Sequence, residues 1–256
     1  MASLNDTAQL FKHLHKPGKP LVLTNVYDGL SARAVASLPN CKALATASFS
    51  VARANGTEDD ELDMETNLSA CELIAAGARE FGKPLTVDIQ DAYGDQLEEA
   101  ISRLVQLGVV GVNLEDCDRS GILYSEEVAA DRIKRALTTA ANENVKDFVV
   151  NARCDALIQG LNLSEVISRG KAYLDAGATT VFVWGGSSRG LARHEVKELV
   201  AAFGGRLNVL LKLSIDGLTI PELAAIGVAR ISIGPTLQVE AMKYYSREAD
   251  KLLSQA

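Results

Sequence analysis

The chain has 256 residues, of which 47% are apolar and 23% charged, and its net charge is −7. This length and balance suit one large α/β domain, and because no linker-like tract interrupts the sequence, residues 1–256 are predicted to form a single domain. Lysines and arginines are scattered rather than clustered, which argues against a nucleic-acid partner, and no apolar run approaches the ~20 residues of a membrane span.

The N-terminal segment MASLNDTAQLFKHLHK lacks the apolar core of a secretory signal. Leu4, Leu10, Phe11 and Leu14 are spaced as in a short amphipathic helix. The four cysteines lie far apart without a CxxC pair, which argues against a zinc cluster and against a disulfide framework. We therefore expect a reducing compartment and a cytoplasmic protein.

Short β-type apolar runs alternate along the chain with amphipathic stretches, a pattern typical of parallel α/β proteins. The eight predicted strands are Leu21–Val26, Ala43–Ser48, Leu85–Gln90, Gly111–Asp116, Phe148–Arg153, Thr180–Gly185, Asn208–Leu213 and Arg230–Pro235. Repeats of strand plus helix at about 30-residue spacing favour a closed (β/α)8 barrel of the TIM type. A doubly wound open sheet is the alternative. A last helix is predicted at Thr236–Ser254.

Polar side chains stand at the carboxyl ends of these strands, where a barrel carries its active site. Asp88 and Gln90 are two residues apart and are expected to project from the same inward face of their strand. Glu115 ends the next strand. Two carboxylates and an amide at one barrel mouth suit a hard cation such as Mg²⁺. Alternatively, Asp88 and Glu115 cap helices or pair with Arg153.

Three later strands end in Arg153, Trp184 and Lys212. Arg153 could hold a substrate carboxylate in a bidentate fork, or it could form an internal ion pair with Asp88, Glu115 or Asp155. Lys212 lies between leucines and is expected to point into the barrel, either as a Schiff-base or charge-stabilising lysine or as the partner of an acid. Trp184 is expected to form the wall of a pocket.

The acidic segment 55–64 (NGTEDDELDM) follows the second strand and is either a solvated loop or a lid over a cation-bearing site. His13, His15 and His194 are predicted to be surface residues on helices, which removes the usual general base and Ser-His-Asp hydrolysis. A P-loop and a GxGxxG fingerprint are also absent from the sequence.

Six segments resemble the isocitrate lyase/phosphoenolpyruvate mutase superfamily, over nearly the whole chain from Val22 to Pro235. They are YDGLSAR (27–33), ATASFSVARANG (45–56), PLTVDIQDAYGD (84–95), GVNLED (111–116), FVVNARCDAL (148–157) and AGATTVFVWGG (176–186). The resemblance implies a divergent, phosphonomutase-like barrel enzyme that depends on Mg²⁺, with Mn²⁺ as a substitute. Such an enzyme would cleave or form a C–C or P–C bond of a small 2-oxo or 2-hydroxy carboxylate through an enolate-like intermediate.

The resemblance also implies roles for individual residues. Asp88 would be the main direct metal ligand, while Glu115 and Asp59 would hold metal-bound water, Asp59 from the lid side. Arg153 would bind the substrate carboxylate. The turn formed by Ala47, Ser48 and Phe49 would offer backbone N–H groups to that carboxylate or to an oxyanion.

The sequence departs from the family pattern around the site. Members typically have DAD where this chain has Asp88-Ile89-Gln90, so one acid of the metal shell becomes a neutral amide. The KxCGH loop of the lyases is replaced by residues 117–123, in which Cys117 is either a replacement acid or a packed thiol. Lys212 stands where the lyases usually have asparagine, and Trp184 stands where many of them have an acidic residue. A genuine isocitrate or methylisocitrate lyase is therefore not expected, and the gating-loop signature of the mutase is not evident.

Three functions remain open. The leading hypothesis is a Mg²⁺-dependent lyase or hydrolase acting on a small carboxylate, with no nucleic-acid or membrane partner. The second is a repurposed barrel enzyme with weak or no metal dependence, whose activity would survive EDTA and would require Lys212. The third is a noncatalytic binding protein, against which the buried charges of Asp88, Glu115 and Arg153 argue because uncompensated buried charges are costly.

The resemblance further implies a homodimer or homotetramer in which subunits exchange the last helix. Its apolar stripe would consist of Leu237, Val239, Met242 and Tyr245.

Overall fold

The strands of the computed structural model, which describes residues 3–187, 189–213 and 217–255, are all parallel. They are β1 (Leu21–Leu23), β2 (Asn25–Val26), β3 (Leu44–Thr46), β4 (Leu85–Asp88), β5 (Gly111–Glu115), β6 (Val149–Cys154), β7 (Thr180–Val183), β8 (Leu207–Leu210) and β9 (Arg230–Ser232). β1 and β2 are separated only by Thr24, and β1 pairs with β9 while β2 pairs with β3. β1 and β2 together correspond to the single predicted strand Leu21–Val26, which joins both ends of the sheet. This confirms the eight-stranded barrel and excludes the open sheet.

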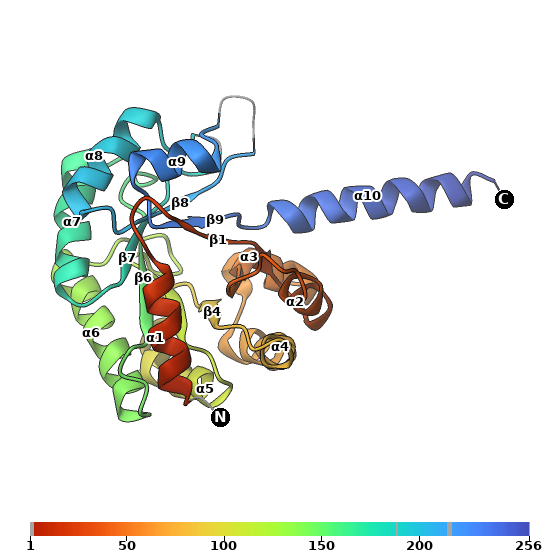
Figure 1. Ribbon diagram of the computed structural model, residues 1–256, viewed down its shortest axis with the longest axis horizontal. Helices are drawn as coiled ribbons and strands as arrows, with labels where there is room; N and C mark the ends of the chain where they lie inside the picture. Colours follow the sequence, from red (N-terminus) through yellow and green to blue (C-terminus); the bar gives the residue numbers. More distant parts are fainter. Residues whose placement is uncertain (1–2, 188, 214–216, 256) are drawn as a thin grey trace.

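Helices follow the strands and cover the outside of the barrel (Figure 1). They are α1 (Leu4–Leu14), α2 (Gly29–Ala36), α3 (Ser48–Ala54), α4 (Met64–Glu80), α5 (Leu97–Gln106), α6 (Glu126–Asn142), α7 (Leu163–Asp175), α8 (Arg193–Phe203), α9 (Ile220–Ile226) and α10 (Thr236–Leu253), with the 3-10 turns η1 (Asp59–Glu61) and η2 (Gly94–Gln96). The apolar stripe of α5 is typical, because Leu97, Ile101 and Leu104 recur at helical spacing and are buried.

Helix α1 confirms the predicted N-terminal helix and packs against the barrel. Its first turn is fixed by a capping box between Ser3 and Asp6. Phe11 is fully buried beside β5, where a Cβ atom on Gly111 would lie 3.1 Å from the Phe11 ring and 2.7 Å from the Val149 carbonyl oxygen. Glycine is therefore required at position 111 to admit this ring.

Several strands are shorter than predicted, so three residues assigned to strand ends lie in loops. Gln90, Trp184 and Lys212 follow β4, β7 and β8 rather than ending them. The apolar runs misled the prediction because the loops above the barrel are themselves buried, as Ile89 and Leu211 are. Buried sequence continues there after the hydrogen-bonded ladder has ended.

A row of polar side chains crosses four adjacent strands of the barrel. Asn113 donates from Nδ2 to Asp88 Oδ1 at 2.9 Å, and Asn151 donates to Asn113 Oδ1 at 2.8 Å. Thr180 completes the row by donating to Asn151 Oδ1 at 2.6 Å. These residues are register partners on neighbouring strands, so their side chains share one face of the sheet. The row ties Asp88 to the centre of the fold.

The prediction that all three histidines lie on the surface is wrong for His15. His13 and His194 are exposed, but His15 is half-buried at the end of α1, and its Nε2 atom is buried without a hydrogen-bond partner among the described residues. Its ring packs edge-on against Phe11 at 4.8 Å between centroids. Burial, assisted by the charge of Arg230, lowers the pKa of His15 to about 3.

Helix α10 extends away from the barrel (Figure 1). Its bounds agree with the predicted last helix to within one residue, and it exposes Leu237, Met242, Tyr244 and Tyr245. Within the described ranges, no helix combines the length and the apolar character that crossing a bilayer requires.

Candidate active site

Asp88 is the last residue of β4, and its carboxylate is held on both oxygens. Oδ2 accepts a hydrogen bond from the Ser48 N–H at 3.0 Å, and Oδ1 accepts from Asn113. Its backbone N–H donates to Thr46 Oγ1 at 2.8 Å. A carboxylate oxygen can accept more than one bond, so each oxygen of Asp88 keeps capacity for a further partner. The Ser48 N–H, expected to face the substrate, is directed at Asp88 instead.

Arg153 forms the internal ion pairs that the sequence left open. Its Nη1 donates to Glu115 Oε1 at 2.7 Å, and its Nε and Nη2 donate to the two carboxylate oxygens of Asp155 at 2.7 and 2.8 Å. The guanidinium also lies 4.3 Å from the ring centroid of Trp184, which stacks on it. Three of its five N–H groups are engaged in these bonds, which leaves two for a substrate carboxylate.

The mouth of the barrel carries more negative charge than Arg153 neutralises. Burial raises the pKa of Glu115 well above its usual range; Arg153 opposes this, while Asp88 and Asp155 reinforce it. Burial and the charge of Asp88 likewise raise the pKa of Asp59. For Arg153, burial alone would lower the pKa, but Glu115 and Asp155 outweigh it and the pKa is raised. A group that carries positive charge would relieve the repulsion among these acids.

The acidic segment is folded against the site and is not a freely solvated loop. Asp59 begins the turn η1, and Gln90 reaches it from the other side of the mouth. Gln90 Nε2 donates to the Asp59 carbonyl oxygen at 2.6 Å and to Asp59 Oδ1 at 3.2 Å. The lid interpretation therefore fits the structure better than the solvated one.

The position of Gln90 differs from the prediction that it shares a strand face with Asp88. Gln90 does not share the inward face of a strand with Asp88, because its backbone adopts the left-handed conformation with φ of 53° after β4 has ended. Its Oε1 atom is buried and accepts no hydrogen bond within the described part of the chain. An unpartnered buried acceptor is costly, so this oxygen is available to a cation or to the water around one.

A cavity of about 370 Å³ opens between the acidic segment and the loop after β5. Phe49, Asp59, Gln90, Glu115 and Cys117 are among the residues that line it. This volume is within the range typical of small-molecule sites. The cavity brings together residues that the sequence assigned separately to metal, substrate and catalytic roles.

Cys117 and Lys212, the two candidate catalytic residues besides Arg153, lie in different surroundings. Cys117 is buried, and burial together with neighbouring acids raises the pKa of its thiol to about 11. It is therefore protonated at neutral pH, which suits an acid better than a nucleophile. Lys212 is exposed beyond β8, so the expectation that it points into a buried interior is not met. Its Cδ lies 3.6 Å from the position a Cβ would take on Gly190.

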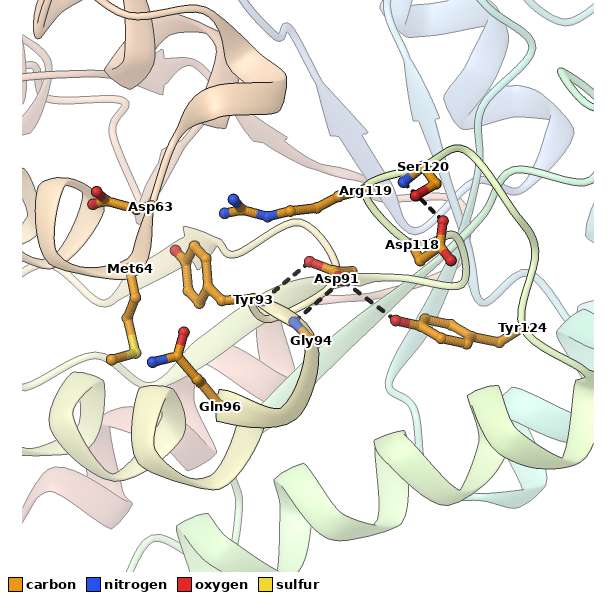
Figure 2. A pocket seen from close by; sticks show the side chains of 10 residues that line it. All are labelled: Asp63, Met64, Asp91, Tyr93, Gly94, Gln96, Asp118, Arg119, Ser120 and Tyr124. Atoms are coloured by element: carbon orange, nitrogen blue, oxygen red, sulfur yellow. Dashed lines mark hydrogen bonds between the residues drawn. The ribbon is translucent and has the colours of Figure 1, made fainter.

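Arg119 separates this cavity from a second one of about 320 Å³. Figure 2 shows Arg119 extending from the loop after β5 toward Asp63 and Tyr93. Its Nη2 donates to the Leu62 carbonyl oxygen, and its guanidinium lies 5.7 Å from the Tyr93 ring centroid. Below it, Asp91 accepts hydrogen bonds from the Gly94 N–H and the Tyr124 hydroxyl.

Sequence reasoning missed Asn113, Arg119 and Asn67, and named Asp155 as one possible ion-pair partner of Arg153. Asn113 and Asp155 contact Asp88 and Arg153 directly, whereas Arg119 and Asn67 hold the surrounding loops; Asn67 donates to the Asp88 carbonyl oxygen at 3.0 Å. A signal was present for Asn113, because it stands two residues before Glu115 and must share its face of the strand. For Arg119 on the loop after β5 and for Asn67 on α4, no spacing rule points to the site.

The residues at the mouth fit a hydrated divalent cation. In the described chain, no three acidic, cysteine or histidine side chains are close enough together to form a complete metal cage. Mg²⁺ does not require one, because it commonly binds one or two carboxylates and keeps several waters. Asp88 is the fixed carboxylate for such a contact, and the buried Oε1 of Gln90 is an acceptor without a donor.

Comparisons with known proteins agree with the site. The family described as phosphoenolpyruvate phosphomutase matches residues 11–253. A structure from Burkholderia cenocepacia J2315, proposed to be a phosphonomutase, is 34% identical with a TM-score of 0.86, covering 97% of this chain and 99% of that one. The phosphonopyruvate hydrolase of Variovorax sp. (strain Pal2) is 30% identical over 73% of this chain and 64% of its own length.

A further solved structure, oxaloacetate acetylhydrolase, is 26% identical with a TM-score of 0.82 and covers 96% of this chain and 86% of that one. Relatives with assigned activities are named as hydrolases, lyases and phosphomutases, and the family match spans almost the whole chain. The chain therefore belongs to the phosphoenolpyruvate phosphomutase family of enzymes.

Proposed function

We propose that the protein is a divalent-cation-dependent enzyme that cleaves a C–C or P–C bond of a small 2-oxo or 2-hydroxy carboxylate. The observation that carries this proposal is a cavity lined by Asp59, Gln90 and Glu115. Asp59 and Glu115 are both electrostatically coupled to Asp88 and to Arg153. A bound cation would reduce the repulsion between these acids. The N–H groups of Arg153 that have no partner among these acids could bind an anion. A small carboxylate bound together with Mg²⁺ or Mn²⁺ satisfies both.

We assign each residue of the site a role from its position. Asp88 would hold the cation directly, with Asp59, Glu115 and the amide oxygen of Gln90 around its water shell. When bound, the cation would neutralise negative charge that develops on the substrate oxygen as the bond breaks. Arg153 would bind the substrate carboxylate through its two remaining N–H groups, with Trp184 fixing the plane of the guanidinium.

Residues beyond the strand ends would transfer a proton and exclude water from the cavity. Cys117 lines the cavity as a thiol, so it carries a proton at Sγ that a leaving carbanion could take. Phe49 and the acidic segment limit the entry of water on the other side. The backbone N–H groups at the start of α3 remain candidates for contact with the substrate, apart from that of Ser48.

A substrate panel with metal control tests this function. Purified protein is incubated with phosphonopyruvate, oxaloacetate and alkylmalates in Mg²⁺, in Mn²⁺ and in EDTA, and pyruvate, oxalate or phosphate is measured. Turnover that requires the metal and is lost in D88N is expected. An exposed acid offers the matched control: D131N, on α6, keeps activity. Turnover that persists in EDTA and disappears in K212A would instead favour the repurposed enzyme.

The structure meets only part of what a noncatalytic protein would require. Arg153 is paired internally with Glu115 and Asp155, as such a protein would show, but Glu115 also lines an open cavity. Because a scaffold has no need for a polar cavity of ligand size, the enzyme remains the better proposal.

We also propose that the protein assembles as a homodimer or homotetramer in which α10 packs on a second subunit. The exposed apolar and aromatic side chains of α10 support this, because a soluble helix rarely exposes so many. Sedimentation of the full chain and of a variant with Met242, Tyr244 and Tyr245 changed to serine tests it. An oligomer that dissociates in the variant is expected, and a monomeric wild type would contradict the proposal.

A further inference from the structure

We propose that Gln90 is a positioning residue that holds the acidic segment Glu58–Leu62 closed over the barrel mouth before any cation binds. The meaning of this closure rests on the proposed function, because it places Asp59 where a cation would be shared with Asp88. The closure itself can be tested in protein from which metal has been removed, without substrate.

The position of Asp59 is electrostatically unfavourable. It lies at the mouth near Asp88, so two carboxylates of like charge are held close to each other there. A carboxylate on a surface loop that is repelled in this way would be expected to move out into water. Because η1 is a single 3-10 turn without a side-chain cap, its own hydrogen bonds are too few to prevent this.

Two side chains from other loops hold the segment in place. Gln90 Nε2 donates to both the carbonyl oxygen and the carboxylate of Asp59, at the start of the turn. At the other end, Arg119 donates to the Leu62 carbonyl oxygen. Leu62 is fully buried and packs with Val51, which anchors that end independently. At the start of the segment, Ser48 is a further hydrogen-bond partner of the Asp59 carboxylate, whereas Gln90 also holds the main-chain carbonyl oxygen of Asp59.

Only a side-chain donor can serve as this tether. The Asp59 carbonyl and carboxylate oxygens are both acceptors, so an acid at position 90 would offer no hydrogen and would add another negative charge. The amide NH₂ group instead carries partial positive charge toward Asp59. Its neutral oxygen, Oε1, stays buried and unpartnered on the other side of the group.

The backbone directs Gln90 toward the segment. Its left-handed φ of 53° turns the chain sharply after Asp88, and its carbonyl oxygen accepts from the Glu115 N–H at 2.8 Å. A non-glycine residue in this conformation is strained and persists only when its surroundings fix it. Gln90 therefore makes two contacts from one strained position. Its carbonyl oxygen binds the Glu115 N–H, and its side chain binds Asp59.

Hydrogen exchange in metal-free protein tests the tether. The amides of Glu61 and Leu62 donate within the turn, to Glu58 at 3.1 Å and to Asp59 at 3.4 Å, so their exchange reports its opening. Two variants are compared with wild type in EDTA. Q90N keeps an amide and suits the left-handed conformation but is one methylene too short, whereas Q90E keeps the length and removes the donor. Q106E adds the same charge on the exposed side of α5 as the control.

Exchange at Glu61 and Leu62 is expected to rise about tenfold or more in Q90N and further in Q90E, which is the size of effect that two lost hydrogen bonds produce. Amides of β5 should keep their wild-type rates in both variants, and Q106E should match wild type throughout. Wild-type exchange of the segment in both Gln90 variants would overturn the proposal. So would a rise that spreads equally to β5, because Gln90 would then support the fold in general. Absence of turnover in the substrate panel would refute the proposed function and leave this result standing.

Discussion

Arg153 and Glu115 form a buried ion pair at the barrel mouth, with 2.7 Å between Nη1 and Oε1 and side-chain exposures of 16% and 13%. The same guanidinium holds Asp155, whose side chain is 3% exposed. Removing the arginine would therefore leave two buried acids without their cation. These contacts make Arg153 a structural centre of the site as well as its proposed carboxylate-binding group.

The first prediction concerns the stability of this cluster. R153M is expected to lower the free energy of unfolding by about 3 kcal/mol, because removing one partner of a buried pair leaves uncompensated charge. Urea denaturation of metal-free protein measures the change. R33M breaks the exposed pair between Arg33 and Glu80, where both side chains are more than half exposed, and should cost at most about 1 kcal/mol. Equal losses in the two variants would contradict the account.

The second prediction concerns the contact of α1 with the barrel. F11A is expected to destabilise the protein by about 3–5 kcal/mol, because it removes a fully buried ring and leaves a cavity beside Gly111. L10A, on the exposed side of the same helix, should change stability by no more than about 0.5 kcal/mol. Thermal or urea unfolding compares them. A small loss in F11A would mean that α1 contributes little to the closed barrel.

The third prediction concerns pH. Because the folded pKa of His15, about 3, is below the unfolded value of 6.5, the unfolded chain binds a proton first as pH falls. The stabilisation is complete above pH 6.5 and is lost progressively toward pH 3. Relative to H15Q, wild type should lose about 1 kcal/mol between pH 7.5 and 5.5. H13Q, at an exposed histidine of the same helix, should follow wild type. Parallel pH curves for wild type and H15Q would refute the assignment.

The residues of the site that could be predicted from sequence are those whose position depends on strand order. Asp88 and Glu115 end β4 and β5, and Arg153 is the last residue but one of β6. Parallel strands bring these carboxyl ends to one mouth. Alternation along a strand would also have placed Asn113 and Asn151 on the inner face, two residues before Glu115 and Arg153. The barrel itself was predicted from the repeat of strand plus helix along the chain.

The remaining features depend on loop conformation and on contacts distant in sequence. The left-handed turn at Gln90 is not encoded by a glycine, so periodicity continued the strand through it. The pairing of Arg119 with Leu62 joins residues 57 positions apart on two loops. Lys212 was misplaced for a related reason, because the apolar run around it extends past the ladder that ends at Leu210. Local sequence patterns carry no information on such contacts.

The most direct test of the central claim, a cation site that binds a small carboxylate, is calorimetry with oxalate and Mg²⁺. Oxalate is expected to bind wild type only when Mg²⁺ is present, and binding should be lost in D88N, whose side chain keeps its size but loses the charge that holds the cation. D131N should bind as wild type does. Oxalate binding that is equal with Mg²⁺ and with EDTA, or that survives in D88N, would contradict the account.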